Sequence, residues 1–407
     1  MKKIHLEQIE GKSAGYMGLL ALLGFFVLGA IGSMLYMEHE GHWVSGMDNQ
    51  IVWGLPHVFA VFLIVAASGA LNVASISSVF QKKIYKPLAP LSTLVALALL
   101  TGGLMVLVLD LGRPDRLIVA MTYYNFKSIF AWNMILYNGF FVIVGVYAWF
   151  MLDRTMKQYS RYAGIAAFVW RLALTTGTGS IFGFIVARSG YDMAMMAPMF
   201  IIMSFSFGLA FFILILLASY NGTNRPLGDV VVNRLRSLLG TFVFATLYFQ
   251  IVYHLSNLYA TEHHAYEAFI LLGEHGGSTY SSIYWIGQII LGSIVPIAMI
   301  YAPALKNCRK TLATASALVV LGGLASMYTI IIAGQAYPLE MFPGMEVVSS
   351  TFFDGATSQY SASLPELLLG LGGVAMTLIM IALGIKVLGF LPASLEDSVA
   401  DPHHKAD

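Results

Sequence analysis

Four ionisable side chains stand close together where a long apolar run of the sequence ends. The run, residues 91–109, contains no charged residue, and the segment VLDLGRPDRL that closes it is broken by a glycine and a proline. The ionisable residues of this segment are Asp110, Arg113, Asp115 and Arg116. Asp110 and Arg113 are one helical turn apart, so they can pair, with Arg113 orienting the carboxylate. Two interpretations stay open: an interfacial cap with an ion pair, or a carboxylate that exchanges protons at a membrane boundary.

Further polar and aromatic residues occupy the matching ends of neighbouring apolar runs. They are Glu38, His39, Glu40 and His42 after the first run, Trp53 and His57 in the second, and Lys127, Ser128, Trp132 and Asn133 at the start of the fourth. If the four helices form a bundle, these residues make a polar pocket with aromatic walls. Asp110, His57 and Glu38 are then the candidates for proton exchange. The side chains expected to contact the ligand are His39, His42, Trp53, Arg113, Ser128, Trp132 and Asn133. The two tryptophans have an alternative role as interface-belt residues.

A quinone suits such a pocket because its ring is apolar while its carbonyls need hydrogen-bond donors and proton-exchanging groups. The chain contains a single cysteine, Cys308. An iron-sulfur cluster usually takes about four thiolate ligands, so this chain alone does not hold one in the usual way. Electrons would therefore have to be exchanged with a separate protein.

A second group of polar residues lies inside the fifth and seventh apolar runs. Gln250, His254 and Asn257 are spaced to share one helix face, and Arg171 stands alone inside the fifth run. These four residues are candidates for a proton path, although an arginine would stabilise anions or water without releasing a proton. His57 and His254 also leave open an alternative function, a b-type cytochrome subunit with one bis-histidine haem.

The composition requires a membrane protein that crosses the bilayer many times. Of the 407 residues, 58% are hydrophobic and 11% charged, and the mean hydropathy is +0.76. The apolar runs predict ten spans, approximately at residues 14–37, 52–80, 90–110, 129–152, 163–187, 195–219, 237–260, 283–303, 312–334 and 364–388. These runs are too long and too continuous for the strands of a membrane barrel. We therefore expect an all-α integral membrane protein of two four-helix bundles plus peripheral helices.

The distribution of basic residues predicts the orientation of the spans. Most of the 22 lysines and arginines fall in the segments that share a side with the amino terminus, which places both termini in the cytoplasm of a bacterial or archaeal cell. We expect a cytoplasmic amino terminus over residues 1–13, a transmembrane domain over 14–390, and a polar, disordered cytoplasmic tail over 391–407. The long outer loops suit a partner at the outer face or simply pack on each other.

Several of these segments resemble a known family. DLGRPDR, the Trp53-Gly54 pair, the ASGA sequence at 67–70 and KSIFAWN at 127–133 are similar to the NrfD/PsrC family, the membrane subunits of polysulfide reductase-like complexes. Ten spans and the segment 48–76 resemble most the members that serve sulfur metabolism. The resemblance implies that Asp110 and Arg113 belong to a quinone-site region and that Trp132 and Asn133 form the matching start of the fourth span. His57 departs from the family pattern, so its contact with quinone is inferred from position.

The resemblance also implies partners and cofactors. The chain would exchange electrons between the quinone pool and a periplasmic iron-sulfur (ferredoxin-like) subunit, within a complex that holds a cytochrome and further iron-sulfur subunits. Quinone or menaquinone would be an exchangeable substrate, with no tightly bound cofactor and no nucleic acid. Two other classes remain as alternatives, a secondary transporter and a purely anchoring subunit. A transporter needs a midplane site, whereas the polar residues here cluster at one boundary.

Overall fold

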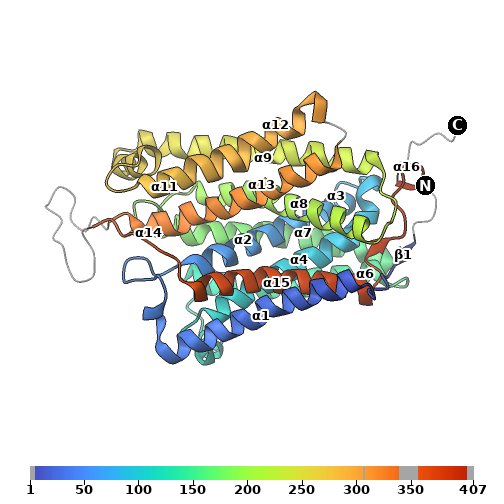
Figure 1. Cartoon of the computed structure of the whole chain (residues 1–407), viewed down its shortest axis with the longest axis horizontal. Helices are drawn as coiled ribbons and strands as arrows, with labels where there is room; N and C mark the ends of the chain where they lie inside the picture. Colours follow the sequence, from blue (N-terminus) through green and yellow to red (C-terminus); the bar gives the residue numbers. More distant parts are fainter. Residues whose placement is uncertain (1–4, 306–307, 339–355, 401–407) are drawn as a thin grey trace.

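The computed structural model describes residues 5–305, 308–338 and 356–400, and within them ten helices are long and apolar enough to cross a membrane. Figure 1 shows these helices running side by side along the long axis of the molecule. The spans are α1 (Ala14–Glu40), α2 (Leu55–Ala70) with α3 (Asn72–Ser78), α4 (Ala89–Leu109), α6 (Ile129–Leu152), α7 (Ser160–Gly183), α8 (Met196–Gly222), α9 (Asp229–Tyr259), α11 (Ser278–Ser282) with η7 (Ile283–Ile294) and α12 (Val295–Tyr301), α13 (Arg309–Tyr328) with η9 (Thr329–Ala333) and α14 (Gly334–Ala336), and α15 (Leu364–Val387). The prediction of an all-α membrane protein with ten spans is confirmed.

Shorter elements join the spans. They are η1 (His42–Val44), η2 (Lys83–Leu88), η3 (Pro114–Arg116), α5 (Leu117–Thr122), η4 (Lys157–Tyr159), η5 (Thr261–His263), α10 (His264–Glu267), η6 (Ala268–Leu272), η8 (Pro303–Leu305), the strands β1 (Leu6–Glu7) and β2 (Leu391–Pro392), and α16 (Asp397–Ala400). Three stretches, η6, η7 and η9, have the wider π-helical turn. Such turns often occur at functional sites.

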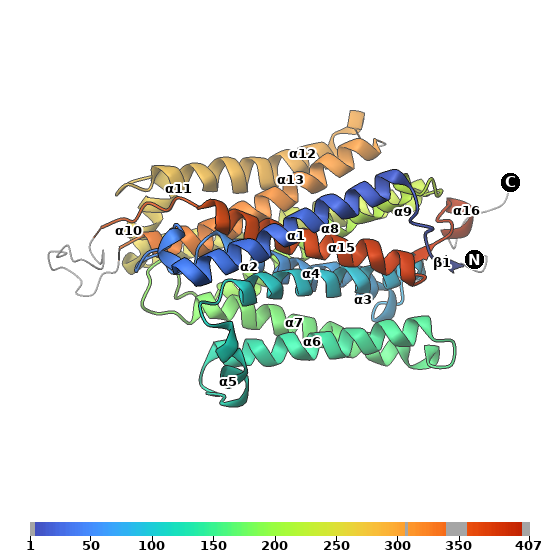
Figure 2. The same ribbon diagram turned by 60° about the horizontal axis from the view of Figure 1, so that its bottom comes forward.

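The spans group into two bundles. The continuous α2–α3 span, α4, α6 and α7 pack in one ring, and α8, α9, the η7–α12 span and α13 pack in another. Contacts of α8 with α2 and α7, and of α13 with α2, join the two rings. The helices α1 and α15 pack on each other and against α4 and α2 at the side. Figure 2 separates the two groups, with α6 and α7 on one side and α12 and α13 on the other, as the sequence predicted.

Helix α1 faces outward and α2 lies at the centre, although both are almost wholly apolar. Leu22, Phe25 and Leu28 of α1 are more than half exposed, while nearly every residue of α2 is buried. In water such exposure would be costly, but in a bilayer an apolar helix face contacts lipid at no such cost. Hydropathy therefore identifies the spans without telling which of them are central.

The closest helix contact is between α2 and α8. A Cβ atom at Gly69 would lie 1.6 Å from the backbone oxygen of Ser204, and one at Gly208 would lie 2.1 Å from the backbone nitrogen of Ala70. The two backbones approach each other because small residues stand at the crossing, the usual way in which membrane helices gain packing contacts. This crossing connects the two bundles.

The described ends of the chain meet at one end of the molecule. Leu6 pairs with Pro392 and Glu7 with Leu391 in a two-stranded antiparallel sheet, and Figure 1 shows β1 and α16 at the same end. The expectation of a disordered tail from residue 391 is therefore wrong for 391–400, because the buried side chains of Leu391 and Leu395 fix this segment to the bundle. Residues 401–407 lie outside the described part of the chain.

We predict that Gly208→Ala destabilises the protein. The added methyl group meets backbone atoms of α2 that cannot move without separating the bundles, so the free energy of unfolding should fall by about 1–3 kcal/mol or more. Thermal unfolding of the purified chain in detergent measures the effect. Gly24→Ala is the matched control, because no atom lies within 4 Å of the position that its methyl group would take on lipid-facing α1. Equal midpoints for the two variants would contradict the close helix contact.

Candidate functional site

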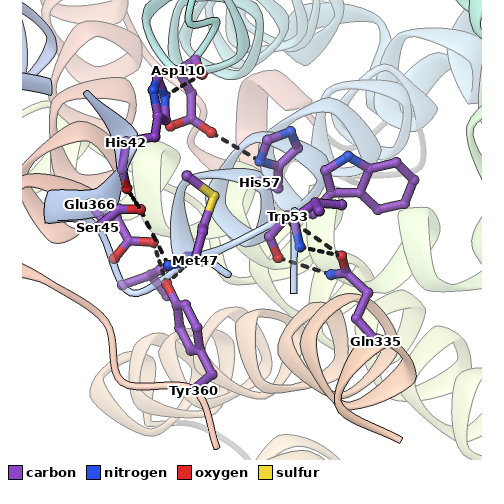
Figure 3. A network of polar contacts seen from close by, with 11 residues as sticks. His42, Ser45, Met47, Trp53, His57, Asp110, Gln335, Tyr360 and Glu366 are labelled. Atoms are coloured by element: carbon purple, nitrogen blue, oxygen red, sulfur yellow. Dashed lines mark hydrogen bonds and ion pairs between the residues drawn. The ribbon is translucent and has the colours of Figure 1, made fainter. Parts of the chain in front are cut away.

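Asp110 and His57 meet at the end of the molecule opposite β1. Asp110 follows the last residue of α4 and is its C-cap, while His57 lies in the first turn of α2, which starts with a proline at its second position. His57 Nδ1 is 3.0 Å from Asp110 Oδ2, and the side chains are 23% and 1% exposed respectively. Figure 3 shows the two side chains pointing toward each other. The pair thus joins a wholly buried carboxylate to an imidazole that has an accessible edge.

The carboxylate of Asp110 has unused capacity to accept hydrogen bonds. Both of its oxygens are buried, and neither accepts a well-aligned hydrogen bond from the described residues, so His57 lies close to the carboxylate without hydrogen-bond alignment. A buried acceptor without a donor costs about 1–3 kcal/mol, and such groups in native proteins call for an explanation. A hydrogen bond from a hydroxyl group to Asp110 would offset the cost of burying these oxygens.

Aromatic rings line one side of the pair. The ring of Trp53 stacks on His57 with 6.1 Å between centroids and 26° between planes. Phe130 of α6 and Phe182 of α7 each meet the Trp53 ring edge-on, again at 6.1 Å. On the other side, His42 Nε2 is 3.2 Å from the backbone oxygen of Asp110. Trp53, His57, Asp110 and His42 therefore lie together, with aromatic rings on one side and polar groups on the other.

The loop between α1 and α2 is held by a buried carboxylate from α15. Glu366 is fully buried and accepts hydrogen bonds from the Gly46 backbone nitrogen at 2.8 Å and from the Tyr360 hydroxyl at 2.6 Å. That hydroxyl in turn accepts from the Leu55 backbone nitrogen at 2.7 Å. Burial and the hydrogen bond to Glu366 raise the pKa of Tyr360 well above its usual value. Figure 3 shows this network beside the His57–Asp110 pair.

Gln335 of α14 fixes Trp53 through the backbone. Its side-chain oxygen accepts from the backbone nitrogens of Val52 and Trp53, both at 3.0 Å, and its amide donates to the Trp53 carbonyl at 3.0 Å. Sequence reasoning missed both Gln335 and Glu366. Glu366 had a signal, since Ser363 and Glu366 form a capping box before an apolar run. Gln335 had no signal, because only the folded chain brings it to Trp53.

The predicted pairing of Arg113 with Asp110 is wrong. Arg113 donates from Nε and Nη2 to the two carboxylate oxygens of Asp115, both at 3.1 Å, and the two side chains are 64% and 61% exposed. The reason is that α4 ends at Leu109, so Asp110 and Arg113 do not share a helix face. The hydrogen bond to Asp115 raises the pKa of Arg113, and the same bond lowers the pKa of Asp115.

The other candidates from the sequence lie around the site without contacting the His57–Asp110 pair in the described contacts. Glu38 and His39 are exposed at the end of α1, where His39 contacts Glu40 at 2.9 Å. Ser128 precedes α6. Trp132 is 46% exposed and donates to the Phe126 carbonyl at 2.9 Å. Asn133 connects α6 to α7 by donating to the Gly177 carbonyl at 3.0 Å.

A second acid–histidine pair lies in the other bundle. His254 Nδ1 is 2.7 Å from Oε2 of Glu267, which is fully buried, and Asn257 donates to Glu267 Oε1 at 2.7 Å. A cavity of about 30 Å³ beside His254 is lined by Gln250 and Gln288, whose side-chain oxygens are buried without hydrogen-bond partners among the described residues. A polar cavity of this size has room for a water molecule. Sequence reasoning had placed Glu267 in an outer loop.

Arg171 is packed elsewhere. It is 1% exposed, donates to the Ser68 carbonyl at 3.3 Å, and lies 4.9 Å and 5.2 Å from the ring centroids of Phe168 and Phe205. These contacts are with α2, α7 and α8, and the contacts described for Arg171 do not reach Gln250, His254 or Asn257. The four proton-path candidates therefore separate into a lone arginine and a group around Glu267.

The fold and the site define the class of protein. The family model described as "Polysulphide reductase, NrfD" matches residues 43–338, a range that includes His57, Asp110 and the second acid–histidine pair. The chain belongs to this family, as the sequence motifs predicted.

Particular relatives extend over nearly the whole chain. The "Hdr-like menaquinol oxidoreductase integral membrane subunit" of Archaeoglobus fulgidus is 27% identical over 398 residues, which cover 98% of this chain and 99% of that protein. A selenate reductase subunit of Mesobacillus selenatarsenatis is 23% identical over 90% of this chain and 92% of its own. A membrane subunit of a putative dimethyl sulfoxide reductase from Halobacterium salinarum is 26% identical over 92% and 91%. All three relatives are thus subunits of oxidoreductases or reductases, and two of them are named as membrane subunits.

We predict that Glu366→Ala loosens the loop over residues 41–54. The substitution removes the acceptor for the Gly46 nitrogen and the Tyr360 hydroxyl, and hydrogen bonds to a charged group contribute about 1.5–3 kcal/mol each. Hydrogen exchange of peptides from this loop, followed by mass spectrometry, should accelerate by about tenfold or more. Glu38→Ala, which removes an exposed carboxylate near the same end, is the control. Unchanged exchange in Glu366→Ala would show that the loop is held by other contacts.

Proposed function

We propose that this chain is a quinone/quinol-interacting membrane subunit that exchanges protons with its substrate at the His57–Asp110 pair. The observation that carries the proposal is the buried carboxylate of Asp110, whose oxygens accept no hydrogen bond from the described residues, beside a partly accessible imidazole. The stacked and edge-on rings around Trp53 suit the apolar ring of a quinone. One relative carries menaquinol oxidoreductase in its name, which supports the same substrate class.

The geometry gives each side chain a role. In the tautomer with a proton on Nδ1, His57 faces the carboxylate of Asp110 with that proton, and its Nε2 is free to accept one from a quinol hydroxyl. The imidazolium that forms is stabilised by the Asp110 carboxylate 3.0 Å away. Oxidation of a quinol to the quinone releases two protons and two electrons, and the accessible edge of His57 lets each proton leave toward the water. Reduction of a quinone reverses these steps.

The electrons need an acceptor or donor outside this chain. The single cysteine, Cys308, is exposed and lies between α12 and α13, at the end away from His57. We therefore propose that a periplasmic iron-sulfur (ferredoxin-like) subunit takes or gives electrons beside His57. A cytochrome and further iron-sulfur subunits would complete the complex.

The resemblance of residues 48–76 supports a more specific place in metabolism. It favours DsrP, the integral membrane subunit of the DsrMKJOP complex of sulfur metabolism, as the counterpart of this chain. Basic residues concentrated at the end that holds β1 and β2 support a plasma-membrane protein with both termini in the cytoplasm.

We also propose that the Glu267 group holds a proton inside the second bundle. His254 and Asn257 contact Glu267, and Gln250 lines the cavity beside His254, whereas Arg171 has no described contact with them. Infrared difference spectra of the complex on quinol addition test this: a carboxyl band absent in Glu267→Gln is expected, and an identical spectrum in that variant would contradict it.

We predict that Asp110→Asn weakens quinol binding by about tenfold or more, because the carboxylate beside His57 Nδ1 favours the tautomer whose Nε2 accepts a hydrogen bond from the quinol hydroxyl, and polar interactions with a charged group contribute about 1.5–3 kcal/mol. Quenching of the intrinsic fluorescence of the purified chain by a menaquinol analogue gives the dissociation constant. Arg113→Gln is the matched control, since Arg113 pairs with Asp115 at the surface, and it should bind within about twofold of the wild type. Equal affinities for the wild type and Asp110→Asn would show that quinol does not bind at the His57–Asp110 pair.

The cytochrome remains the second candidate because of one observation. Both His57 and His254 have Nδ1 on a carboxylate, which is also how proteins orient histidines that ligate a metal through Nε2. We expect the pyridine haemochrome spectrum of the purified chain to show no haem. Stoichiometric haem that disappears in both His57→Ala and His254→Ala would establish the cytochrome instead.

A further inference from the structure

A large cavity opens in the first bundle at the end opposite His57. Its volume is about 680 Å³, within the range of about 300–1,000 Å³ that is usual for small-molecule sites. The walls come from the start and end of several spans: α3, η2, α6, η4 and α7 all contribute, and Leu6 of β1 closes one side. The cavity therefore lies at the same end as the described chain termini and is separate from the proposed quinone site.

The cavity is strongly basic. Its lining includes Lys83 and Lys86 of η2, Lys157 of η4 and Arg161 of α7, and no aspartate or glutamate. Within the described ranges, no acidic side chain is in ion-pair contact with any of these four. Four cations around one concave space repel each other unless an anion binds there. The preference for lysine and arginine in cytoplasmic loops explains why basic residues occur at this end of the chain. It does not explain why four of them line the same cavity.

The cations are the donors that an anion would use. The hydroxyls of Ser77, Ser78 and Ser160 also line the cavity, but each donates its proton to a backbone carbonyl of the chain. Ammonium and guanidinium groups supply several donors to phosphate oxygens, and charge-assisted bonds of this kind are the stronger ones. The chemistry of the cavity thus selects a phosphate group.

Exposed aromatic residues place the cavity at the level of lipid headgroups. Trp149 of α6, Tyr159 of η4 and Tyr162 of α7 are 54%, 47% and 72% exposed, and tryptophan and tyrosine concentrate at membrane–water interfaces. From this level, Val142 on α6 and Val169 on α7 continue an exposed apolar face toward the centre of the spans. A ligand with a phosphate in the cavity and acyl chains along α6 and α7 would satisfy both surfaces.

We propose that this cavity binds the phosphate headgroup of an anionic phospholipid. Basic pockets between spans on the cytoplasmic side are a recurrent way of recognising such lipids. The exposed apolar face beside the cavity favours a lipid over free phosphate, because only a lipid has chains to cover it. Binding here would secure the ends of α3, α6 and α7 at the inner boundary of the first bundle.

Native mass spectrometry of the purified full chain with phosphatidylglycerol, cardiolipin and phosphatidylcholine tests the proposal. The wild type should prefer the anionic lipids, and the double variant Lys83→Gln/Lys86→Gln should bind them about tenfold or more weakly. The double variant Lys12→Gln/Lys82→Gln is the control. It removes two basic residues from the same end that do not line the cavity, so its affinity should stay within about twofold of the wild type.

Three results would overturn the proposal. One is binding of phosphatidylcholine as tight as that of the anionic lipids. Another is an equal loss of affinity for anionic lipids in the Lys83→Gln/Lys86→Gln variant and in the Lys12→Gln/Lys82→Gln control. The third is displacement of the lipid by inorganic phosphate at equal concentration, which would assign the cavity to free phosphate. If the lining double variant does not fold, Lys157→Gln at the exposed η4 turn makes the same comparison, and Lys83→Arg/Lys86→Arg should retain binding.

Discussion

A carboxylate that is buried in a helix bundle and lacks hydrogen-bond donors is the constraint on which the rest of the structure depends. Removing Asp110 from water is costly unless a partner offsets the loss, and His57 at 3.0 Å does so only in part. The surrounding structure serves to hold that pair in place. The capped end of α4 fixes the carboxylate, and the ring of Trp53 lies against the histidine.

The loop that carries Trp53 is positioned by residues from the other half of the chain. Gln335 and Glu366, together with Tyr360, accept hydrogen bonds from backbone nitrogens before α2 and at its first residue. Irregular backbone near a membrane is tolerated where its polar groups find partners inside the protein. The first bundle therefore contributes the side chains proposed to react, while α14 and α15, which lie outside this bundle, hold the loop that positions them. A similar arrangement, a histidine against a buried acid, recurs in the second bundle at His254 and Glu267.

Sequence reasoning predicted the spans and grouped Asp110 with His57 and Trp53, and it failed for other contacts made between distant segments. Hydropathy was sufficient for ten helices because each had to cross the same apolar layer. Asp110 was found because it follows an uncharged run. Its partner was misassigned because a helical spacing rule was applied across the point where α4 ends. Glu267 was missed because α10 and η6 return the chain toward α9, and Gly273, with φ +75°, then turns it into the next span. No local pattern marks such a return.

The central claim is that the substrate meets the protein at the His57–Asp110 pair. A photoreactive menaquinone analogue, irradiated with the purified chain and mapped by peptide mass spectrometry, tests this directly. The account predicts labelling of peptides that contain residues 53–57 and 108–118, and protection of both by excess unlabelled quinone. Protected labelling confined to the second bundle around His254, with none near His57 or Asp110, would contradict it.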